Sequence, residues 1–275
     1  MRRLIVKKSL LFLPILFNLC WAQVEQPFPP LNLVNIPTAG TLPRGSFTLE
    51  SLIIKSGGIV PRLSIGFTDN FTFGVSYGVQ NLIGDAKPSI NKTTPEVQIK
   101  YRVFDESKKM PALVYGLDTQ GRGIFHGIDS IKSIKDSTIT LNRYDQKAWG
   151  MYIVFSKNWN LMGNLGMHAG ISKSLSENDD GDKDLNVFFG FDKELNRSFS
   201  LLVEYDAALN DNLTEDDYGA IKKITFGRGK GYLNAGVRWA ISSNLMLEVN
   251  LNDINQNTEA EYTNREIKVI YSESF

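Results

Sequence analysis

The chain has 275 residues, with 30 basic and 30 acidic side chains and a formal net charge of zero. This balance gives no general attraction for nucleic acid, so a nucleic-acid partner is not expected. The one cysteine, Cys20, lies near the N-terminus, and a chain cleaved just after it has no thiol for disulfides or zinc sites.

The first predicted element is a secretion signal. MRRLIVKK is basic, SLLFLPILFNL is apolar, and the small residue Ala22 precedes Gln23. This order predicts a cleavable signal peptide over residues 1–22. The apolar stretch is too short for a membrane-spanning helix, which needs roughly 20 apolar residues. A proline-rich segment, 23–45, follows, and we expect it to lie in the periplasm.

From Gly45 onward the chain alternates apolar with small or polar residues, which is typical of strands rather than helices. FTFGVSYGV (71–79) and LMLEVNLN (245–252) are clear examples. The full set of expected strands is 46–55, 58–67, 71–79, 96–104, 112–118, 149–156, 161–172, 185–192, 199–207, 232–241, 245–252 and 266–272.

The connections between these strands decide the architecture, because they are alternately short and long. Short turns are expected at 68–70, 105–111, 157–160, 193–198 and 242–244, whereas connections such as 80–95 and 118–148 are long and polar. Transmembrane barrels have short periplasmic turns and long extracellular loops. We therefore predict an all-β fold, an antiparallel up-and-down barrel of about twelve strands over 46–275, in the outer membrane of a Gram-negative cell. Membrane lipid and the barrel-assembly machinery are its expected partners.

The alternation also assigns the two faces of the predicted barrel. Placing residues such as Val203 and Val237 toward lipid turns their charged neighbours inward, and a one-residue slip would reverse every face. Placing an Arg or Lys toward lipid at the bilayer midplane costs about 2–4 kcal/mol of stability, so the slipped register is strongly disfavoured. The predicted lumen-lining residues are Arg62, Lys100, Arg102, His168, Glu204, Asp206, Arg238 and Glu248.

Two local features refine the expected barrel. Aromatic residues near strand ends predict two girdles at the membrane surfaces. One comprises Phe67, Phe71, Phe155, Trp159, Phe199 and Trp239, and the other Tyr77, Trp149, Tyr205 and Tyr232. Pro61 lies inside an expected strand and cannot donate a hydrogen bond, so a bulge or a later strand start is predicted there.

Catalytic and metal sites are not indicated. His126 lies in a long loop and His168 points into the lumen, and no spacing sets a serine or carboxylate beside His126. ENDDGDKD (177–184) is acidic but lacks the glycine and glutamate positions of a calcium loop. We predict no cofactor and no enzyme activity.

Three segments resemble the YjbH-type outer-membrane barrels. NLVNIPTAGTLPRGSF (32–47), YIVFSKNWNLMGNLGMHAGIS (152–172) and LLVEYD (201–206) are similar to that family's entry segment, Ser-Lys hairpin and Glu-Tyr-Asp strand. The family-like positions are Pro37, Thr38, Ala39, Glu204, Tyr205 and Asp206. The resemblance implies a role in making or exporting exopolysaccharide.

Three functions therefore remain open. The first is a non-enzymatic surface or export component linked to exopolysaccharide, and the second is a narrow channel for a polysaccharide or small solute. An outer-membrane enzyme is the third. Mixed charges in the lumen fit either a salt-bridged plug or a narrow pore, because twelve strands lie between filled and open barrels in width.

Overall fold

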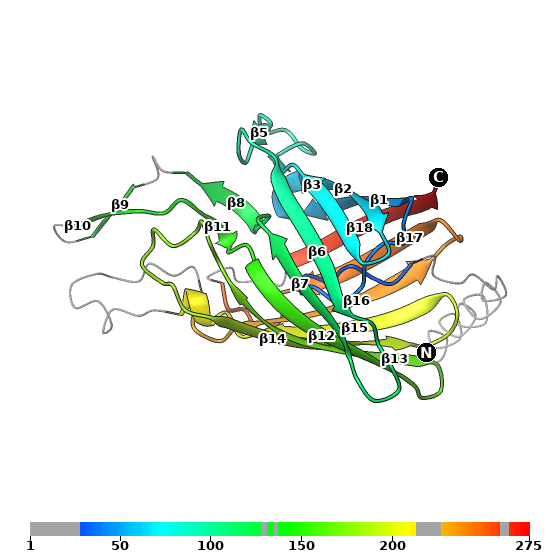
Figure 1. Cartoon of the computed structure of the whole chain (residues 1–275). Coiled ribbons are helices and arrows are strands. Elements are labelled where there is room, and N and C mark those ends of the chain that lie inside the picture. Colours follow the sequence, from blue (N-terminus) through cyan, green and yellow to red (C-terminus); the bar gives the residue numbers. More distant parts are fainter. Residues whose placement is uncertain (1–27, 128–130, 135–136, 213–226, 259–263) are drawn as a thin grey trace, which may run out of the picture.

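The computed structural model describes residues 28–127, 131–134, 137–212, 227–258 and 264–275. The predicted signal peptide lies outside this range. One sheet of fourteen strands closes on itself, because β1 pairs with both β2 and β18. Two of the fourteen, β4 and β5, form a small extension, and the other strands make a closed antiparallel barrel of twelve, as predicted (Figure 1).

The barrel strands follow one another round the sheet. They are β1 (Ser46–Ile54), β2 (Gly58–Thr68), β3 (Phe71–Ser76), β6 (Glu96–Phe104), β7 (Ala112–Asp118), β12 (Gly150–Asn160), β13 (Asn164–Lys173), β14 (Asn186–Glu194), β15 (Phe199–Asp206), β16 (Tyr232–Ala240), β17 (Leu245–Asn252) and β18 (Asn264–Ser274). Short turns gather at the end that holds the C-terminus, which we call the short-turn end (Figure 1).

The connections at the opposite end, called the outer end, are mostly long and form small elements of their own. These are η1 (Lys55–Gly57), β4 (Val79–Gln80), β5 (Ser89–Ile90), β8 (Arg122–His126), β9 (Ile131–Ile134), β10 (Ser137–Thr140), β11 (Arg143–Gln146) and η2 (Leu209–Asp211). In the part of the chain that is described, no helix has the length and apolar character to cross a membrane.

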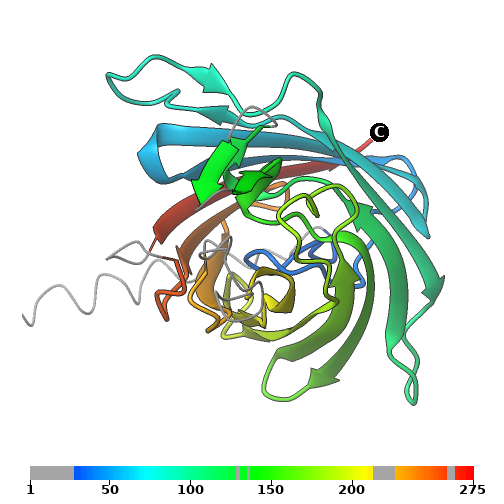
Figure 2. The ribbon, with the colours of Figure 1, turned by 90° about the vertical axis from the view of Figure 1, so that its left-hand side faces the viewer.

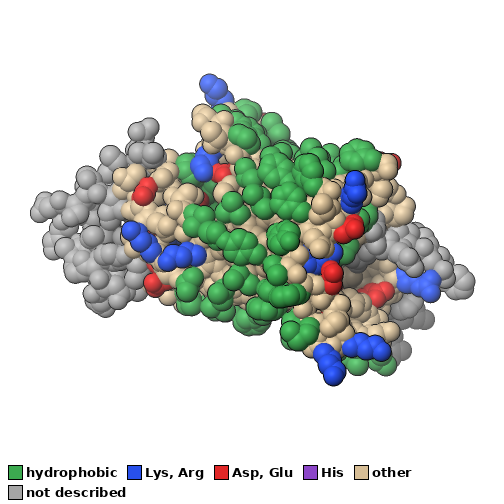
Figure 3. Space-filling view, in the orientation of Figure 1, with side chains coloured by type: hydrophobic (Ala, Val, Ile, Leu, Met, Phe, Trp, Pro, Cys, Tyr) green, Lys and Arg blue, Asp and Glu red, His purple; other side chains and the backbone are tan. Residues whose placement is uncertain are grey.

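The two faces of the barrel separate apolar from polar side chains. Val237 and Val249 pair across β16 and β17 and are 41% and 52% exposed, whereas their neighbours Arg238 and Glu248 are 2% and 0% exposed. On the face seen in Figure 3, the outward apolar side chains form a band across the middle of the barrel, with charges on both sides of it. A closed barrel with such a band is an outer-membrane protein.

Some local predictions are wrong. β12 continues to Asn160, so the turn to β13 lies at 161–163 rather than 157–160. β2 begins at Gly58 and passes Pro61 in register with Ser51, without the predicted bulge. The carbonyl of Pro61 accepts from the Tyr77 amide, so its nitrogen faces the break between β3 and β4, where no donor is needed.

The predicted aromatic girdles are partly wrong. At the short-turn end, Phe199 and Trp239 stack with their ring centroids 5.7 Å apart, and Trp239 is exposed. At the outer end, however, Trp149 and Tyr232 are buried inside the barrel. Trp149 packs edge-on against Phe188 of β14, in the buried cluster that includes Leu33, and a strand-by-strand pattern does not encode this contact.

Residues 28–45, here called the lumenal segment, lie inside the barrel (Figure 2). The proline-rich composition of residues 23–45 predicts a periplasmic location instead. It forms a hairpin whose arms are joined by a bridge between Asn32 and Pro37, with a turn closed by the Leu33 amide and the Ile36 carbonyl, 3.0 Å apart. Its side chains explain its position, because Leu33, Val34 and Ile36 are each at most 1% exposed.

Candidate functional site

The lumen has an apolar wall and a charged wall, and the lumenal segment contacts both. Strands β7, β12, β14 and β15 supply the apolar wall. Its side chains form one buried cluster with those of the segment, comprising Leu33, Val34, Ile36, Ala39, Ala112, Val114, Trp149, Tyr152, Val154, Phe188 and Leu202. Short side chains such as Ala112 and Val114 leave the room that the segment occupies.

Cationic side chains of the charged wall hold the main chain of the lumenal segment. They donate to successive carbonyl oxygens at residues 31–34, and the donors lie on three strands and one outer hairpin. These contacts are Lys100 to Leu31, Arg238 to Asn32 (3.1 Å), Lys268 to Leu33 (3.3 Å), and both Lys268 (3.2 Å) and Arg122 (2.8 Å) to Val34.

One carboxylate holds the turn of the segment from the other side. Glu204, 1% exposed, accepts hydrogen bonds from the amides of Asn35 (2.9 Å) and Ile36 (3.0 Å) and from the Asn234 side chain (2.7 Å). A buried carboxylate that accepts main-chain amides forms strong, charge-assisted hydrogen bonds. Residues 201–206 of β15 therefore meet the lumenal segment at Glu204.

The remaining lumenal charges pair within the wall. Glu248 accepts from Arg238 Nε (2.6 Å) and lies 3.1 Å from Lys268 Nζ, so one carboxylate serves two cations. Arg62 pairs with Asp118 at 3.1 Å. Because every partner is buried, removing one member leaves an uncompensated charge.

His168 lies on the inner face of β13, within a chain of hydrogen bonds. Its Nδ1 is 2.7 Å from Ser156 Oγ and its Nε2 is 2.9 Å from Asp192. These are the residue types of a catalytic triad, but Ser156 Oγ also accepts the Ala39 amide at 2.8 Å. The lumenal segment thus covers the hydroxyl, and the three residues act as an anchor for it.

The last two predicted lumen residues lie at opposite ends of the barrel. Asp206, at the outer end of β15, accepts from Asn186 (2.6 Å) and the Ala208 amide (3.0 Å). Arg102 lies at the short-turn rim rather than in the lumen, where it contacts Asp105 at 2.9 Å and the Asp69 carbonyl at 2.9 Å.

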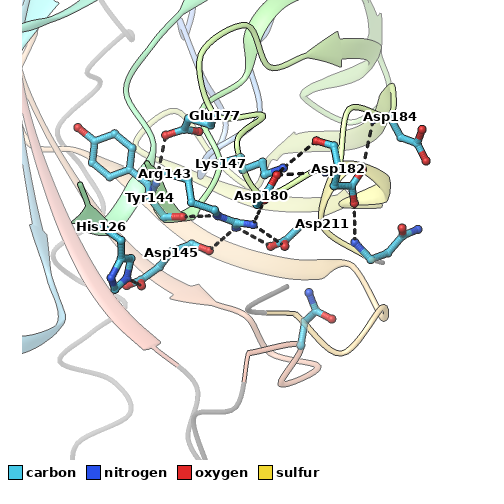
Figure 4. Close-up of polar contacts among 12 residues, drawn as sticks. His126, Arg143, Tyr144, Asp145, Lys147, Glu177, Asp180, Asp182, Asp184 and Asp211 are labelled. Carbon is cyan, nitrogen blue, oxygen red and sulfur yellow. Dashed lines mark hydrogen bonds and ion pairs between the residues drawn. The ribbon is translucent and has the colours of Figure 1, made fainter. Parts of the chain in front are cut away.

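Above the lumenal segment, parts of the outer connections form a second layer, which we call the cap: residues 119–127, 141–149, 174–185 and 207–212. Arg143, fully buried, is bidentate to Asp211 (2.7 and 2.8 Å) and 2.8 Å from Asp180 (Figure 4). Lys147 also binds Asp180, at 2.9 Å. The acidic stretch considered as a calcium loop therefore provides partners for these two cations.

Glu177 joins two parts of the cap. Its carboxylate accepts the amides of Tyr144 (3.1 Å) and Ala148 (2.6 Å). Burial raises the pKa of Glu177 to about 7, against the opposing effect of those two amides and of Arg143. This carboxyl therefore titrates close to neutral pH.

Small cavities lie between the described residues of the lumen. One cavity of about 30 Å³ lies between the segment and β1–β2, lined by Val34, Glu50 and Arg62 among others, and another of about 30 Å³ lies beside Pro30 and Met246. A third, of about 20 Å³, lies at the outer end. Each has room for about one or two water molecules. Among the described residues, the lumenal segment and the cap thus obstruct the barrel interior.

Sequence reasoning missed several residues of this site. Arg122 and Arg143 lie in the connection 118–148, which was expected to be a plain extracellular loop. Three further residues, Ser156, Asp118 and Asp192, were not among the predicted lumen-lining residues. A connection of that length without structure of its own is unusual. Length was thus the available signal, although it does not reveal the partners of either arginine.

Comparisons with known proteins find barrels of the same general kind. No family model matches the chain, and no curated protein matches it. Among solved structures, KdgM porin in complex with disordered oligogalacturonate has a TM-score of 0.46 and 11% identity, covering 84% of this chain and 99% of that one. NanC porin has a TM-score of 0.42 and 8% identity, covering 83% of this chain and 99% of that one. The translocator domain of the autotransporter NalP from Neisseria meningitidis has a TM-score of 0.35 and 12% identity, covering 84% of this chain and 86% of that one. YjbH-type membership stays a prediction.

Proposed function

We propose that this protein is a narrow channel for small polar solutes, closed by its own lumenal segment. The observation that carries the proposal is the nature of the filling. The barrel is not filled by its wall alone, since a separate hairpin occupies the lumen and is bonded mainly through side chains. Its ladder-type bridge joins two of its own residues, Asn32 and Pro37. It can therefore leave without breaking any pairing between barrel strands.

The closed state should dominate at rest. Three fully buried apolar side chains, Leu33, Val34 and Ile36, each contribute roughly 1.5–3 kcal/mol to holding the segment in place. Opening the channel exposes these three side chains to water, so the stimulus that opens it must supply the free energy of their burial. We therefore expect purified protein to conduct rarely.

A channel explains the charged wall better than a surface or export role does. The cations on β6, β16 and β18 bind neutral carbonyl oxygens of the segment, and they would face water once it leaves. The link to exopolysaccharide rests on the resemblance of residues 32–47, 152–172 and 201–206 and stays a prediction.

Conductance in planar bilayers tests the proposal. Deleting residues 29–40 should convert rare openings into steady conductance, and adding Arg143→Gln should remove any further block from the cap. A tethered variant, Ala39→Cys with Ser156→Cys, should be silent when oxidised, because the Ala39 amide lies 2.8 Å from Ser156 Oγ. When reduced it should conduct at least as often as the parent, since the serine hydroxyl no longer holds the segment.

Each preparation must first pass a folding check, in which unboiled and boiled samples migrate differently on a denaturing gel. If the deletion combined with Arg143→Gln is folded but silent, the protein is not a channel. Equal conductance of the parent and the deletion variant would instead mean that the lumenal segment is not its gate.

A further inference from the structure

The cavity of about 20 Å³ at the outer end is lined by polar side chains from four different parts of the chain. They include Asn252 at the end of β17, Asn264 and Glu266 at the start of β18, Arg122 of β8 and Gln146 of β11. Its rim reaches Lys55, whose side chain is 32% exposed. Solutes arriving from outside therefore meet this cavity before they meet the lumenal segment.

Two of the residues that line the cavity each carry a buried acceptor without a hydrogen-bond partner. Asn252 and Asn264 are 1% and 8% exposed and are paired in register, and the Oδ1 atom of each is buried and unpartnered. The orientation of Asn252 is determined, because its Nδ2 donates to Glu266 at 3.1 Å and a flipped amide would place oxygen against that carboxylate. A buried acceptor without a hydrogen bond lowers the stability of the folded protein, and in native proteins such an atom commonly marks a bound water or ligand.

The charges around these acceptors narrow the class of ligand. Arg122 and Lys55 line the cavity, so a cation would meet repulsion. Glu266 and Asp145 line it as well, and with two carbonyl oxygens they disfavour an anion. A neutral group that donates hydrogen bonds satisfies both amide oxygens without either penalty. Hydroxyl groups are such donors, and a cavity of this volume admits one in place of a water molecule.

We propose that this cavity is a subsite for one hydroxyl of a neutral polyhydroxylated solute, such as a sugar or polyol. The hydroxyl donates to Asn252 or Asn264 while the rest of the molecule stays at the outer mouth. That this solute is also the one transported rests on the proposed channel function.

The position of Arg122 places the subsite beside the gate. Its guanidinium donates to Glu266 at 2.7 Å and to the Val34 carbonyl, at the turn of the lumenal segment, at 2.8 Å. A solute oxygen that accepts from Arg122 would compete with Val34 for the same donor. Recognition at the outer mouth would in this way weaken one of the bonds that hold the segment closed.

Calorimetric titration of the folded, detergent-solubilised protein with methyl glucoside tests the subsite. Glycine betaine, which has no hydroxyl, is the control solute. Asn264→Ala should weaken binding by about tenfold, the effect of losing roughly one good hydrogen bond. Asn250→Ala is the matched control variant, because Asn250 is also buried with an unpartnered Oδ1 but lies outside this cavity.

Binding of methyl glucoside to the parent and to Asn250→Ala, with weak binding to Asn264→Ala, supports the subsite. Absence of glucoside binding, equal binding of betaine, or equal effects of the two alanine variants would overturn it. The readout is independent of conductance. If the protein binds methyl glucoside but does not conduct, the subsite is supported and the channel function is contradicted. If it conducts but does not bind methyl glucoside, the channel function is supported and the subsite is contradicted.

Discussion

Glu204 and Glu177 are both buried carboxylates that accept main-chain amides, yet they serve different layers of the closure. Glu204 holds the turn of the lumenal segment, and Glu177 holds β11 to the connection after β13. Amide donors favour the ionised form, whereas burial opposes it. For Glu177 burial is the larger effect.

The raised pKa of Glu177 makes the cap sensitive to pH. With a folded-state pKa of about 7, against an ordinary value of 4.5, the closed cap binds a proton that the open cap does not. The stabilising effect is therefore full at acidic pH and is lost as the pH rises through about 7. Hydrogen exchange at the Tyr144 and Ala148 amides, corrected for the intrinsic rate, should show decreasing protection from pH 5 to pH 8.

Glu177→Gln is the control for this pH effect, since glutamine keeps an acceptor and does not titrate. Its protection should vary little over the same range. A parent profile as flat as that of the variant would mean that Glu177 does not govern the cap.

At the scale of the single strand, β15 presents two faces whose substitution should have different consequences. Val203→Arg places a cation toward lipid and costs about 2–4 kcal/mol near the midplane, so folded yield in outer-membrane fractions should fall. Glu204→Gln keeps the strand pairing but removes the charge that accepts hydrogen bonds from the Asn35 and Ile36 amides. This change should weaken the retention of the lumenal segment by about 1–3 kcal/mol. It should fold and conduct more often than the parent.

The pair of substitutions on β15 separates barrel assembly from closure. Equal folded yields for Val203→Arg and Glu204→Gln would mean that the register of β15 is wrong. A folded Glu204→Gln variant with the parent's rare openings would show that Glu204 does not retain the lumenal segment.

Across the whole molecule, the end at which a residue lies should decide its access to protease. Lys183 and Arg228 are exposed at the outer end, and Lys108, Lys109 and Arg197 are exposed in short turns. Trypsin added to intact cells should cut only at the first two sites, and permeabilised cells should be cut at all five. Because all five are exposed, burial cannot explain a difference. Cleavage of the short turns in intact cells would mean that the barrel is inverted.

Much of the barrel could be predicted from sequence because lipid selects each residue of a strand separately. Val203 and Glu204, or Val237 and Arg238, reveal their faces through their own polarity and the period of two. Closure then follows, since unpaired strand edges are not tolerated in lipid. The register of each hairpin was less accessible, as the turn between β12 and β13 shows, because polar residues such as Asn158 and Asn160 fit either a strand end or a turn.

The interior depended on contacts between residues distant in sequence. Nothing local to Val34 indicates that its carbonyl meets Arg122 and Lys268, and nothing local to Arg143 indicates Asp180 and Asp211. The proline-rich composition of residues 23–45 fits a periplasmic linker as well as an insert. Sequence alone determined the barrel, its faces and its membrane, because those follow from local hydrophobicity. Only the tertiary structure decided that the lumenal segment obstructs the lumen, because burial of Leu33, Val34 and Ile36 requires an apolar wall built from four separate strands.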